Sequence, residues 1–254
     1  MKLVTLNTWG GRSLYPLMKF FERRAKDTDI FCLQEVFHAD QVVVDARHPG
    51  QHVHAPLFGK ISDALSDFNG AFAAFEDNPH RMSLAMFVRK TIASKFAEDV
   101  VVHKPKNPKE TGSAIFSSRK LQHVTVETLQ GEVTIVNYHG LWNNGPKTDT
   151  PERILQSIAI TKFLETIPGP RVFCGDLNLL PDTNSMYKLE VGMRNLVKEF
   201  DVTSTRTPLY RHYDDPDEPN FADYILLSPS IHVLRFEVLP DLVSDHSPLF
   251  LEFA

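Results

Sequence analysis

The stretch that decides the fold is Phe173-Cys174-Gly175-Asp176-Leu177-Asn178. Residues 171–174 form a short apolar run with β-branched and aromatic side chains, which is typical of a buried strand. The run ends at Gly175, and Pro181 stops regular structure soon afterwards. A buried strand therefore brings the carboxylate of Asp176 and the carboxamide of Asn178 to the edge of a sheet. Taken alone, an Asx-type turn is the commoner explanation of this pair.

The composition excludes several classes of protein. The chain of 254 residues has enough apolar material for a large core and contains no apolar run of membrane length. Because no charged-then-apolar leader follows Met1, we expect a cytoplasmic monomer without stable membrane insertion. The net charge of -5 disfavours a protein that coats nucleic acid but permits an enzyme that binds a few phosphates. Cys32 and Cys174 each lie in an apolar run, which predicts free buried thiols.

Strand-like runs dominate the rest of the chain. They cover 2–6, 29–34, 70–75, 82–88, 113–117, 121–128, 132–138, 171–175, 222–228, 231–239 and 248–253. Helical spacing predicts helices over 14–26, 57–67 and 151–165, with Ser13 as the cap of the first. Hairpin-like turns at Arg119-Lys120 and Gln130-Gly131 favour mainly antiparallel sheets. No repeat or linker divides the chain, so we expect one α/β (α+β) domain over 1–254.

Polar side chains recur where these strands end or begin. The residues concerned are Asn7, Glu35, His139, Asp176, Asn178, Asp223, Asp245 and His246. In antiparallel sheets, the ends of some strands and the starts of their neighbours lie on the same rim. Each residue has an ordinary explanation by itself, such as a strand end at the surface for Glu35 or a packed imidazole for His139. Eight such residues at six strand boundaries favour one shared pocket.

Several short motifs carry a resemblance to a known family. They are Leu6-Asn7-Thr8-Trp9-Gly10, Leu33-Gln34-Glu35-Val36, Gly112-Ser113-Ala114-Ile115-Phe116-Ser117, Asn137-Tyr138-His139-Gly140, Gly175-Asp176-Leu177-Asn178, Ala222-Asp223-Tyr224-Ile225 and Ser244-Asp245-His246-Ser247-Pro248. In this order they resemble the endonuclease/exonuclease/phosphatase superfamily. Its members include exonuclease III-like enzymes, pancreatic-type deoxyribonuclease, neutral sphingomyelinases and inositol polyphosphate phosphatases. The resemblance implies a four-layer sandwich of two mainly antiparallel β-sheets, packed face to face, with helices on both outer faces.

The residue types suit metal-dependent cleavage of a phosphoester. Such cleavage must neutralise charge on the phosphate, produce an attacking hydroxide and stabilise the leaving oxygen. Glu35 is the expected anchor for Mg²⁺, with Mn²⁺ as a possible substitute, because Mg²⁺ is usually held by one or two carboxylates, water and substrate oxygens. The resemblance adds Asn7 and Asp245 as direct or water-mediated ligands.

The remaining candidates are assigned to proton transfer and phosphate binding. Asp176 is the expected general base, with Asn178 positioning it or the phosphate, and His139 contacts the phosphate or acts as general acid. His246 is expected to bind phosphate and to be oriented by Asp223, since a carboxylate fixes the tautomer of an imidazole.

Two observations qualify the assignment of the metal and phosphate ligands. Adjacent Asp245 and His246 are expected to point in different directions, so that one serves the metal and the other the phosphate. Exonuclease III-like enzymes carry a second acid where this chain has Trp9, which cannot bind a cation. A site for a single metal ion is therefore the simpler expectation.

Two polar segments are candidates for substrate recognition. Residues expected to contact the substrate are Lys104, Lys106 and Lys109 in a basic segment, and Arg206, Tyr210 and Arg211 in a later one. The basic segment is also typical of a solvated loop, and acidic residues at 214–218 would oppose phosphate binding. The sequence predicts a Mg²⁺-dependent phosphodiester hydrolase acting on DNA or RNA. The alternatives are hydrolysis of small phosphate esters, inositol phosphates or lipid headgroups, and a catalytically silent binding member, which has no need of the complete acid and histidine set.

Overall fold

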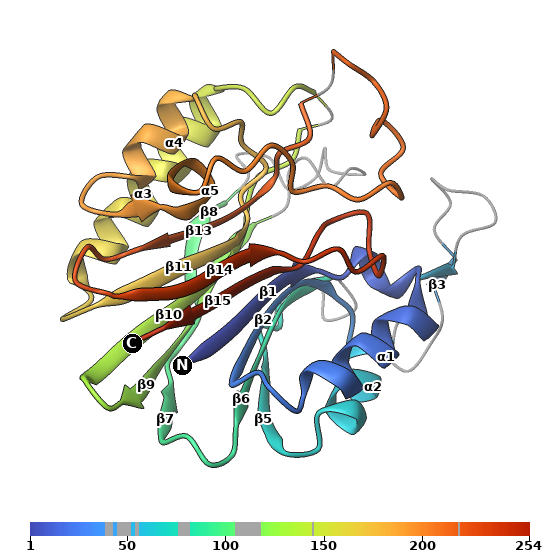
Figure 1. Cartoon of the computed structure of the whole chain (residues 1–254). Helices are drawn as coiled ribbons and strands as arrows, with labels where there is room; N and C mark the ends of the chain where they lie inside the picture. Colours follow the sequence, from blue (N-terminus) through green and yellow to red (C-terminus); the bar gives the residue numbers. More distant parts are fainter. Residues whose placement is uncertain are drawn as a thin grey trace.

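Two β-sheets lie face to face at the centre of the computed structural model (Figure 1), which describes residues 1–38, 43–44, 52–53, 56–75, 82–104, 118–143, 145–217 and 219–254. The first sheet has the strand order β14-β15-β1-β2-β6-β5. Its strands are β1 (Lys2–Asn7), β2 (Ile30–Val36), β5 (Phe68–Phe72), β6 (Ser83–Arg89), β14 (Val233–Val238) and β15 (Leu249–Phe253).

The second sheet has the order β12-β13-β11-β10-β9-β7, and β8 also pairs with β9. Its strands are β7 (Ser94–Phe96), β8 (Val100–His103), β9 (Arg119–Thr128), β10 (Gly131–His139), β11 (Arg171–Asp176), β12 (Arg194–Asn195) and β13 (Asp223–Leu227). A separate ladder joins β3 (Val43–Val44) to β4 (His52–Val53).

Helices cover the outer faces of both sheets (Figure 1). Helices α1 (Leu14–Arg24) and α2 (Leu57–Ala64) pack on the first sheet, and α3 (Pro151–Thr166), α4 (Asn184–Leu189) and α5 (Leu196–Glu199) lie on the second. The pairs β1–β2 and β10–β11 are parallel and are connected through α1 and α3, whereas the other pairs are antiparallel. The predicted four-layer sandwich is confirmed. None of the helices in the described part of the chain is long and apolar enough to span a membrane.

Strand alternation divides each sheet into an inner and an outer face. In β2, Ile30 and Cys32 belong to the core between the sheets, while Phe31 and Leu33 pack with the outer helices. Cys174 of β11 lies in the same inner core, and both cysteines are buried and free, as predicted. The inner face therefore continues from these apolar residues toward the ends of the strands.

A layer of buried amides follows this apolar core toward the rim. The Gln34 side chain donates from Nε2 to Asn137 Oδ1 at 2.7 Å and to Thr5 Oγ1 at 3.1 Å. Asn137 donates in turn to the carbonyl oxygens of Leu33 at 3.0 Å and Ala85 at 3.3 Å. These bonds run from one sheet to the other and therefore fix their relative position directly below the rim.

Some local predictions differ from the structure. The three predicted helices are present, but α1 and α2 end two and three residues earlier than expected. Ser13 makes no side-chain capping bond to α1. A turn at Arg119-Lys120 is wrong, because both residues lie in β9, where Arg119 pairs with His103 of β8. The chain does turn before Gly131, and the predicted strand 113–117 lies outside the described residues.

The short helix α4 is anchored by a carboxylate from a distant segment. Asp149 Oδ1 accepts from the backbone N–H and the hydroxyl of Ser185 at 2.8 and 2.7 Å, and Oδ2 accepts from Asn184 N at 2.8 Å. Burial raises the pKa of Asp149, but these hydrogen bonds lower it by more, so the pKa lies below its ordinary value. The ionised carboxylate therefore stabilises the fold by satisfying the N–H groups of the first turn.

We expect Asp149→Asn to lower the free energy of unfolding at pH 7 by about 1–2 kcal/mol. A depressed folded-state pKa means that the contribution is complete above the unfolded pKa, about 4, and disappears as pH falls through the folded value. Urea unfolding of both proteins at pH 7, 5 and 3 measures the difference. Asp182→Asn, at a side chain 84% exposed, is the control and should have little effect. A difference that grows below pH 4 would contradict this account.

Candidate active site

Three strands of the second sheet bring polar side chains to one rim. In the strand register, His139 at the end of β10 is paired with Asp176 at the end of β11. Asp176 is paired in turn with Asp223 at the start of β13. The three residues thus form a row across neighbouring strands, and both aspartates are almost completely buried.

The first sheet faces this row with its own strand ends. Asn7, the last residue of β1, donates from Nδ2 to Asp176 Oδ2 at 2.9 Å. Glu35 lies in β2 where the pairing with β6 shifts register between Leu33 and Val36, and its φ is +55°. Such an irregularity re-aims a side chain, and here it turns Glu35 toward the site. This bulge left no signal in the sequence.

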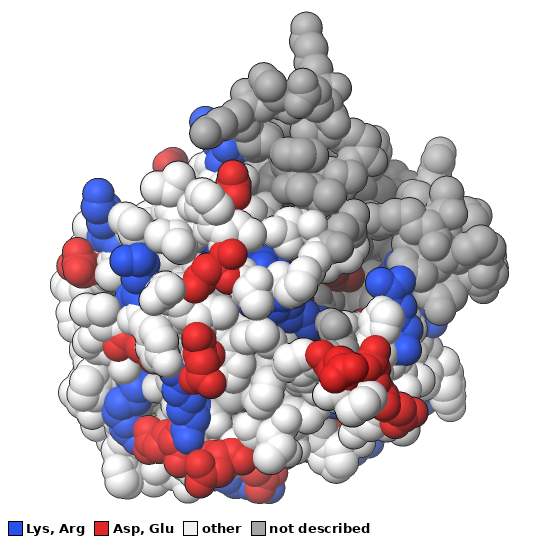
Figure 2. All heavy atoms as spheres, turned by 90° about the horizontal axis from the view of Figure 1, so that it is seen from above, with Lys and Arg blue, Asp and Glu red and all other residues white. Residues whose placement is uncertain are grey.

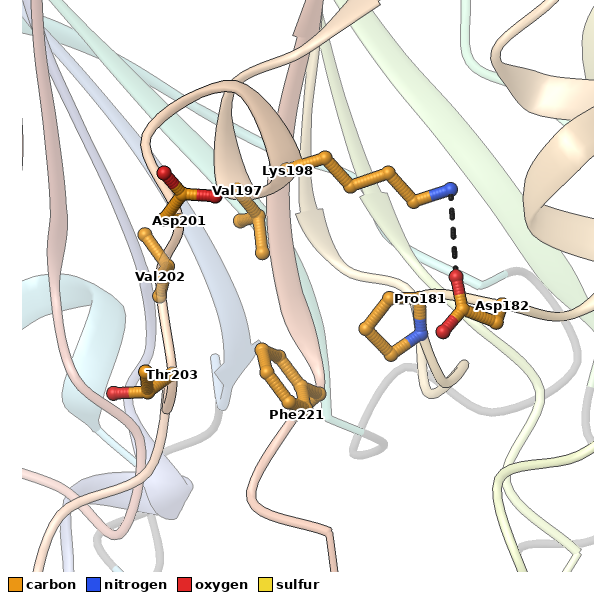
Figure 3. Close-up of a pocket in the computed structure, with 8 residues that line it drawn as sticks. All are labelled: Pro181, Asp182, Val197, Lys198, Asp201, Val202, Thr203 and Phe221. Atoms are coloured by element: carbon orange, nitrogen blue, oxygen red, sulfur yellow. Dashed lines mark ion pairs between the residues drawn. The ribbon is translucent and has the colours of Figure 1, made fainter.

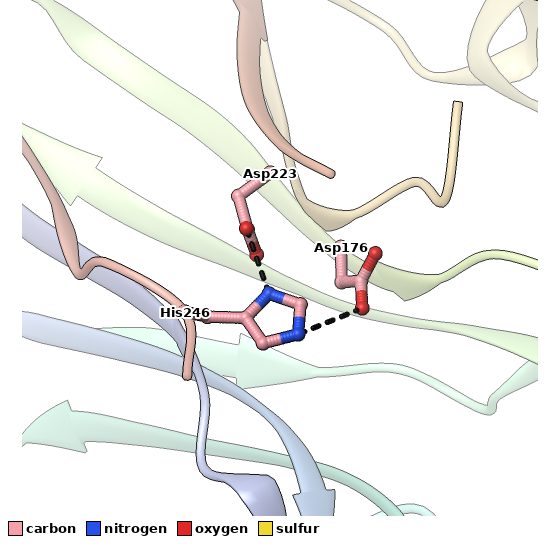
Figure 4. A group of neighbouring side chains, drawn as sticks. All are labelled: Asp176, Asp223 and His246. Carbon is pink, nitrogen blue, oxygen red and sulfur yellow. Dashed lines mark hydrogen bonds and ion pairs between the residues drawn. The ribbon is translucent and has the colours of Figure 1, made fainter. Parts of the chain in front are cut away.

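The imidazole of His246 lies between two aspartates (Figure 4). Its Nδ1 is 2.8 Å from Asp223 Oδ2, and its Nε2 is 3.7 Å from Asp176 Oδ2. The side chain of Asp245 is also near, with Oδ1 3.9 Å from the same Nε2. Burial and the Arg206 guanidinium lower the pKa of His246. The three surrounding carboxylates raise it by more, so the pKa lies above its ordinary value.

The expectation that Asp245 and His246 point in different directions is wrong. Their side chains approach each other because residues 245–246 precede β15, so the alternation of a strand does not apply to them. His246 instead forms an isolated β-bridge with Arg206.

Asp176 is contacted by residues of both sheets. Its Oδ1 accepts from the backbone N–H of Asn178 at 2.9 Å, and its Oδ2 lies 3.6 Å from His139 Nε2. Burial raises the pKa of Asp176, but the nearby charges of His246, His139 and Arg206 lower it well below its ordinary value. Asp176 is therefore ionised at neutral pH. Asn178 holds it through the backbone.

Two glycines allow the ends of β10 and β11 to approach closely. A Cβ on Gly140 would lie 2.1 Å from the carbonyl oxygen of Leu177. A Cβ on Gly175, whose φ is +136°, would lie 2.0 Å from the carbonyl oxygen of Tyr138. Any other residue would push the two strand ends apart. The glycines beside the motif residues therefore keep His139 next to Asp176.

The carboxylates are arranged in a way that suits a divalent cation. Burial raises the pKa of Glu35, and the negative charges of Asp245 and Asp176 raise it further. His139 Nε2 is 4.0 Å from Glu35 Oε1. Crowded carboxylate oxygens with partial access to solvent are ligands that Mg²⁺ and Mn²⁺ prefer, so the residues fit such an ion.

A second grouping of possible metal ligands overlaps the first. One ligand atom each from Asp176, Asp223 and His246 lies within 4.8 Å of the others. The short contact between Asp223 Oδ2 and the imidazole, however, already occupies Nδ1. Glu35 and Asp245 are another set of carboxylates that could hold the ion, and they leave the contact between Asp223 and His246 intact.

The residues predicted to contact substrate do not lie together on an exposed surface. Arg206 is 7% exposed, and its Nη1 donates to Asp245 Oδ2 at 3.1 Å, so it belongs to the site itself. The guanidinium also lies 4.4 Å from the centre of the Tyr210 ring. Arg211 and Lys104 are exposed. Lys106 and Lys109 lie outside the described residues.

Arg119 is a candidate that sequence reasoning missed. Burial lowers its pKa, whereas the charges of Asp176 and Glu35 raise it, which places the guanidinium close to the site. Its Nε is buried and has no hydrogen-bond partner in the described part of the chain. The position of Arg119 at the start of a strand could have indicated its place near the site, but the residue was assigned to a turn.

Two threonines that flank Arg206 were also missed. The Thr205 hydroxyl accepts from the backbone N–H groups of Ala222 at 3.0 Å and Asp223 at 3.2 Å. Thr207 donates from Oγ1 to the carbonyl oxygen of Ser244 at 2.6 Å. The two hydroxyls therefore fasten the segment that carries Arg206 to both sides of the site.

The described part of the chain also contains a groove of about 440 Å³ (Figure 3). Its lining comprises Pro181, Asp182, Val197, Lys198, Asp201, Val202, Thr203 and Phe221. None of these is a candidate catalytic residue, and Lys198 Nζ lies 4.0 Å from Asp182 Oδ1. The chemistry is therefore assigned to the rim and not to the groove.

Solved structures with the same fold include enzymes of different specificity. The mannosyl-6-phosphatase of Bacteroides thetaiotaomicron VPI-5482 has a TM-score of 0.71 at 16% identity, over 100% of this chain and 99% of that one. A humanized D. rerio TDP2 has a TM-score of 0.69 at 14% identity, over 100% and 98%. The human Nocturnin catalytic domain has a TM-score of 0.65 at 18% identity, over 100% and 93%.

At these identities the likeness shows the fold alone, and no curated protein matches the chain. The family, however, is shown by the sequence itself. Residues 4–246 match the model of the Endonuclease/Exonuclease/phosphatase family, and the chain therefore belongs to this family of phosphoesterase hydrolases.

Proposed function

We propose that the chain, as one domain, hydrolyses phosphoesters with a divalent cation and with Asp176 as general base. The observation that carries this proposal is the position of Asp176. It is buried, ionised and held at once by Asn7 and by the backbone of Asn178, with two imidazoles nearby. A carboxylate fixed in this way can orient a water molecule and take its proton as the oxygen attacks phosphorus.

Cationic side chains around Asp176 are suited to the phosphate. The imidazole of His246 is oriented by its contact with Asp223. Arg119 offers a buried Nε donor without a partner among the described residues. Fixed donors of this kind stabilise the negative charge that develops in the transition state.

Glu35 and Asp245 would hold the cation, with Asn7 and water completing its ligands. The bound ion would supply Lewis-acid stabilisation of the phosphoryl oxygens. His139 lies beside both Asp176 and Glu35, and we assign it to the leaving oxygen, to which it donates a proton or a hydrogen bond. The residues of this chain thus cover the three requirements of the reaction.

For the substrate, the structure favours a small phosphate ester over nucleic acid. Two buried cations beside the ring of Tyr210 are engaged internally: Arg206 pairs with Asp245, and Lys147 donates to the carbonyl oxygen of Phe221 at 2.7 Å. On the face drawn in Figure 2, the described basic and acidic residues are interspersed. A phosphate backbone needs several accessible cations. The named mannosyl-6-phosphatase with the same fold shows that the fold accommodates a sugar phosphate.

Direct comparison of substrates tests this choice. We expect Mg²⁺-dependent release of phosphate from mannose 6-phosphate and related monoesters, and little cleavage of duplex DNA, single-stranded DNA or RNA at equal phosphate concentration. Malachite green detection and gel analysis measure the two activities. Cleavage of an oligonucleotide at a kcat/KM above that of every monoester would restore the nucleic-acid assignment.

Metal dependence is the second expectation. EDTA should abolish turnover and added Mg²⁺ should restore it, because the carboxylates alone repel the phosphate. Glu35→Gln should lower kcat/KM by at least about 10²-fold and raise the Mg²⁺ concentration needed for half-maximal rate. Glu22→Gln, at an exposed side chain of α1, is the matched control. Full activity in excess EDTA would exclude the proposed mechanism.

The general base can be tested by Asp176→Asn. The amide keeps the shape of the side chain and can still accept from Asn7, but it cannot take a proton. We expect kcat to fall by at least about 10²-fold with a small change in KM. Circular dichroism should show an unchanged fold. If kcat stays close to that of the wild type, another group is the base, and His139 is the next candidate.

A further inference from the structure

Arg206 is a permanent cation within the carboxylates of the site. Its Nη1 lies 3.1 Å from Asp245 Oδ2, and it is almost completely buried. A guanidinium is not deprotonated in proteins, so Arg206 carries its positive charge at every pH at which the protein is folded.

The position of this cation is fixed by the surrounding structure. The backbone of Arg206 bridges to His246, and the hydroxyls of Thr205 and Thr207 bind the segments on either side. The guanidinium stacks on the ring of Tyr210 at 4.4 Å. It is consequently a built-in part of the site and does not swing in with the substrate.

One donor of the guanidinium remains available. Nη1 is used by Asp245, whereas Nε is buried and has no hydrogen-bond partner among the residues that the structure describes. A buried N–H without a partner costs free energy, which an oxygen of a bound anion would recover. Arg206 can thus compensate the Asp245 carboxylate through Nη1 and donate from Nε to an oxygen of a bound phosphate.

We propose that Arg206 is a positioning residue that sets the balance between cation and phosphate binding. The positive charge of Arg206 compensates the negative charge of Asp245. Arg206 therefore weakens the attraction of the site for the metal and reduces the repulsion between the carboxylates and the phosphate. This inference rests on the proposed function for the phosphate site. It places the charge of Arg206 inside the site, where it acts on the metal and the phosphate, and not on a surface that would contact a long substrate.

The physical reason is that the fixed positive charge of Arg206 repels the metal cation and attracts the phosphate anion. Glu35, Asp176, Asp223 and Asp245 together attract a divalent cation and repel a phosphate. The positive charge of Arg206, placed beside Asp245, opposes the first effect and relieves the second. If the contribution of Arg206 were purely structural, removal of its side chain would instead weaken the binding of both the metal and the phosphate.

The test measures the two affinities separately in Arg206→Met. Mn²⁺ binding is followed by electron paramagnetic resonance without phosphate, and inorganic phosphate binding by calorimetry at saturating Mn²⁺. We expect Mn²⁺ to bind on the order of tenfold more tightly and phosphate on the order of tenfold more weakly than in the wild type. Arg206→Lys keeps the charge and should change both by much less. Arg235→Met removes an exposed arginine of β14 and is the control.

Changes of the same sign, or no change, would overturn the inference. Thermal unfolding checks each variant, and Arg206→Gln replaces the methionine variant if the latter does not fold. If the wild type binds neither Mn²⁺ nor phosphate, the proposed function fails and the inference with it. If the opposite changes occur but no phosphoester is hydrolysed, the inference stands and the proposed catalytic function fails.

Discussion

The contact of 2.8 Å between Asp223 Oδ2 and His246 Nδ1 joins the two sheets at the rim, and the rest of the site depends on it. Both groups are buried, so separating them would leave an unpaired charge in a poorly solvated place. The pair therefore specifies how the sheets meet. A slip of one residue in β13 would turn Asp223 to the opposite face of the sheet. The fold and the site are thus fixed by the same register.

Polarity increases in steps along the inner face of the sandwich. Cys32 and Cys174 lie in the apolar core, Gln34 and Asn137 form the amide layer, and Asp176 stands at the rim. Amides can satisfy one another without carrying net charge, so they separate the charged groups from the apolar core. This order allows ionised groups to be held rigidly at a small distance from a hydrophobic interior.

The sequence predicted those features that depend on local patterns. Alternating apolar runs located most strands, and the polar residues at their ends indicated the rim. The turn at Arg119-Lys120 was wrong because pairing with β8 overrides a local polar signal. The inward direction of Arg206 could not be predicted, since it depends on contacts with Asp245, distant in sequence. The same applies to the bulge at Glu35, which exists only relative to β6.

Backbone conformation links this bulge to the chemistry. Among the described residues that are not glycine, Trp9, Glu35, Asn178 and Asp201 have positive φ, and the first three adjoin the site. Such conformations carry strain of about 1 kcal/mol or more and persist only where surrounding contacts determine them. Here those contacts include the Trp9 N–H bond to Asn7 Oδ1 and the Asn178 N–H bond to Asp176 Oδ1, each 2.9 Å. The strained residues therefore support the side chains assigned to metal and proton transfer. The folded chain holds these groups in place before any substrate binds.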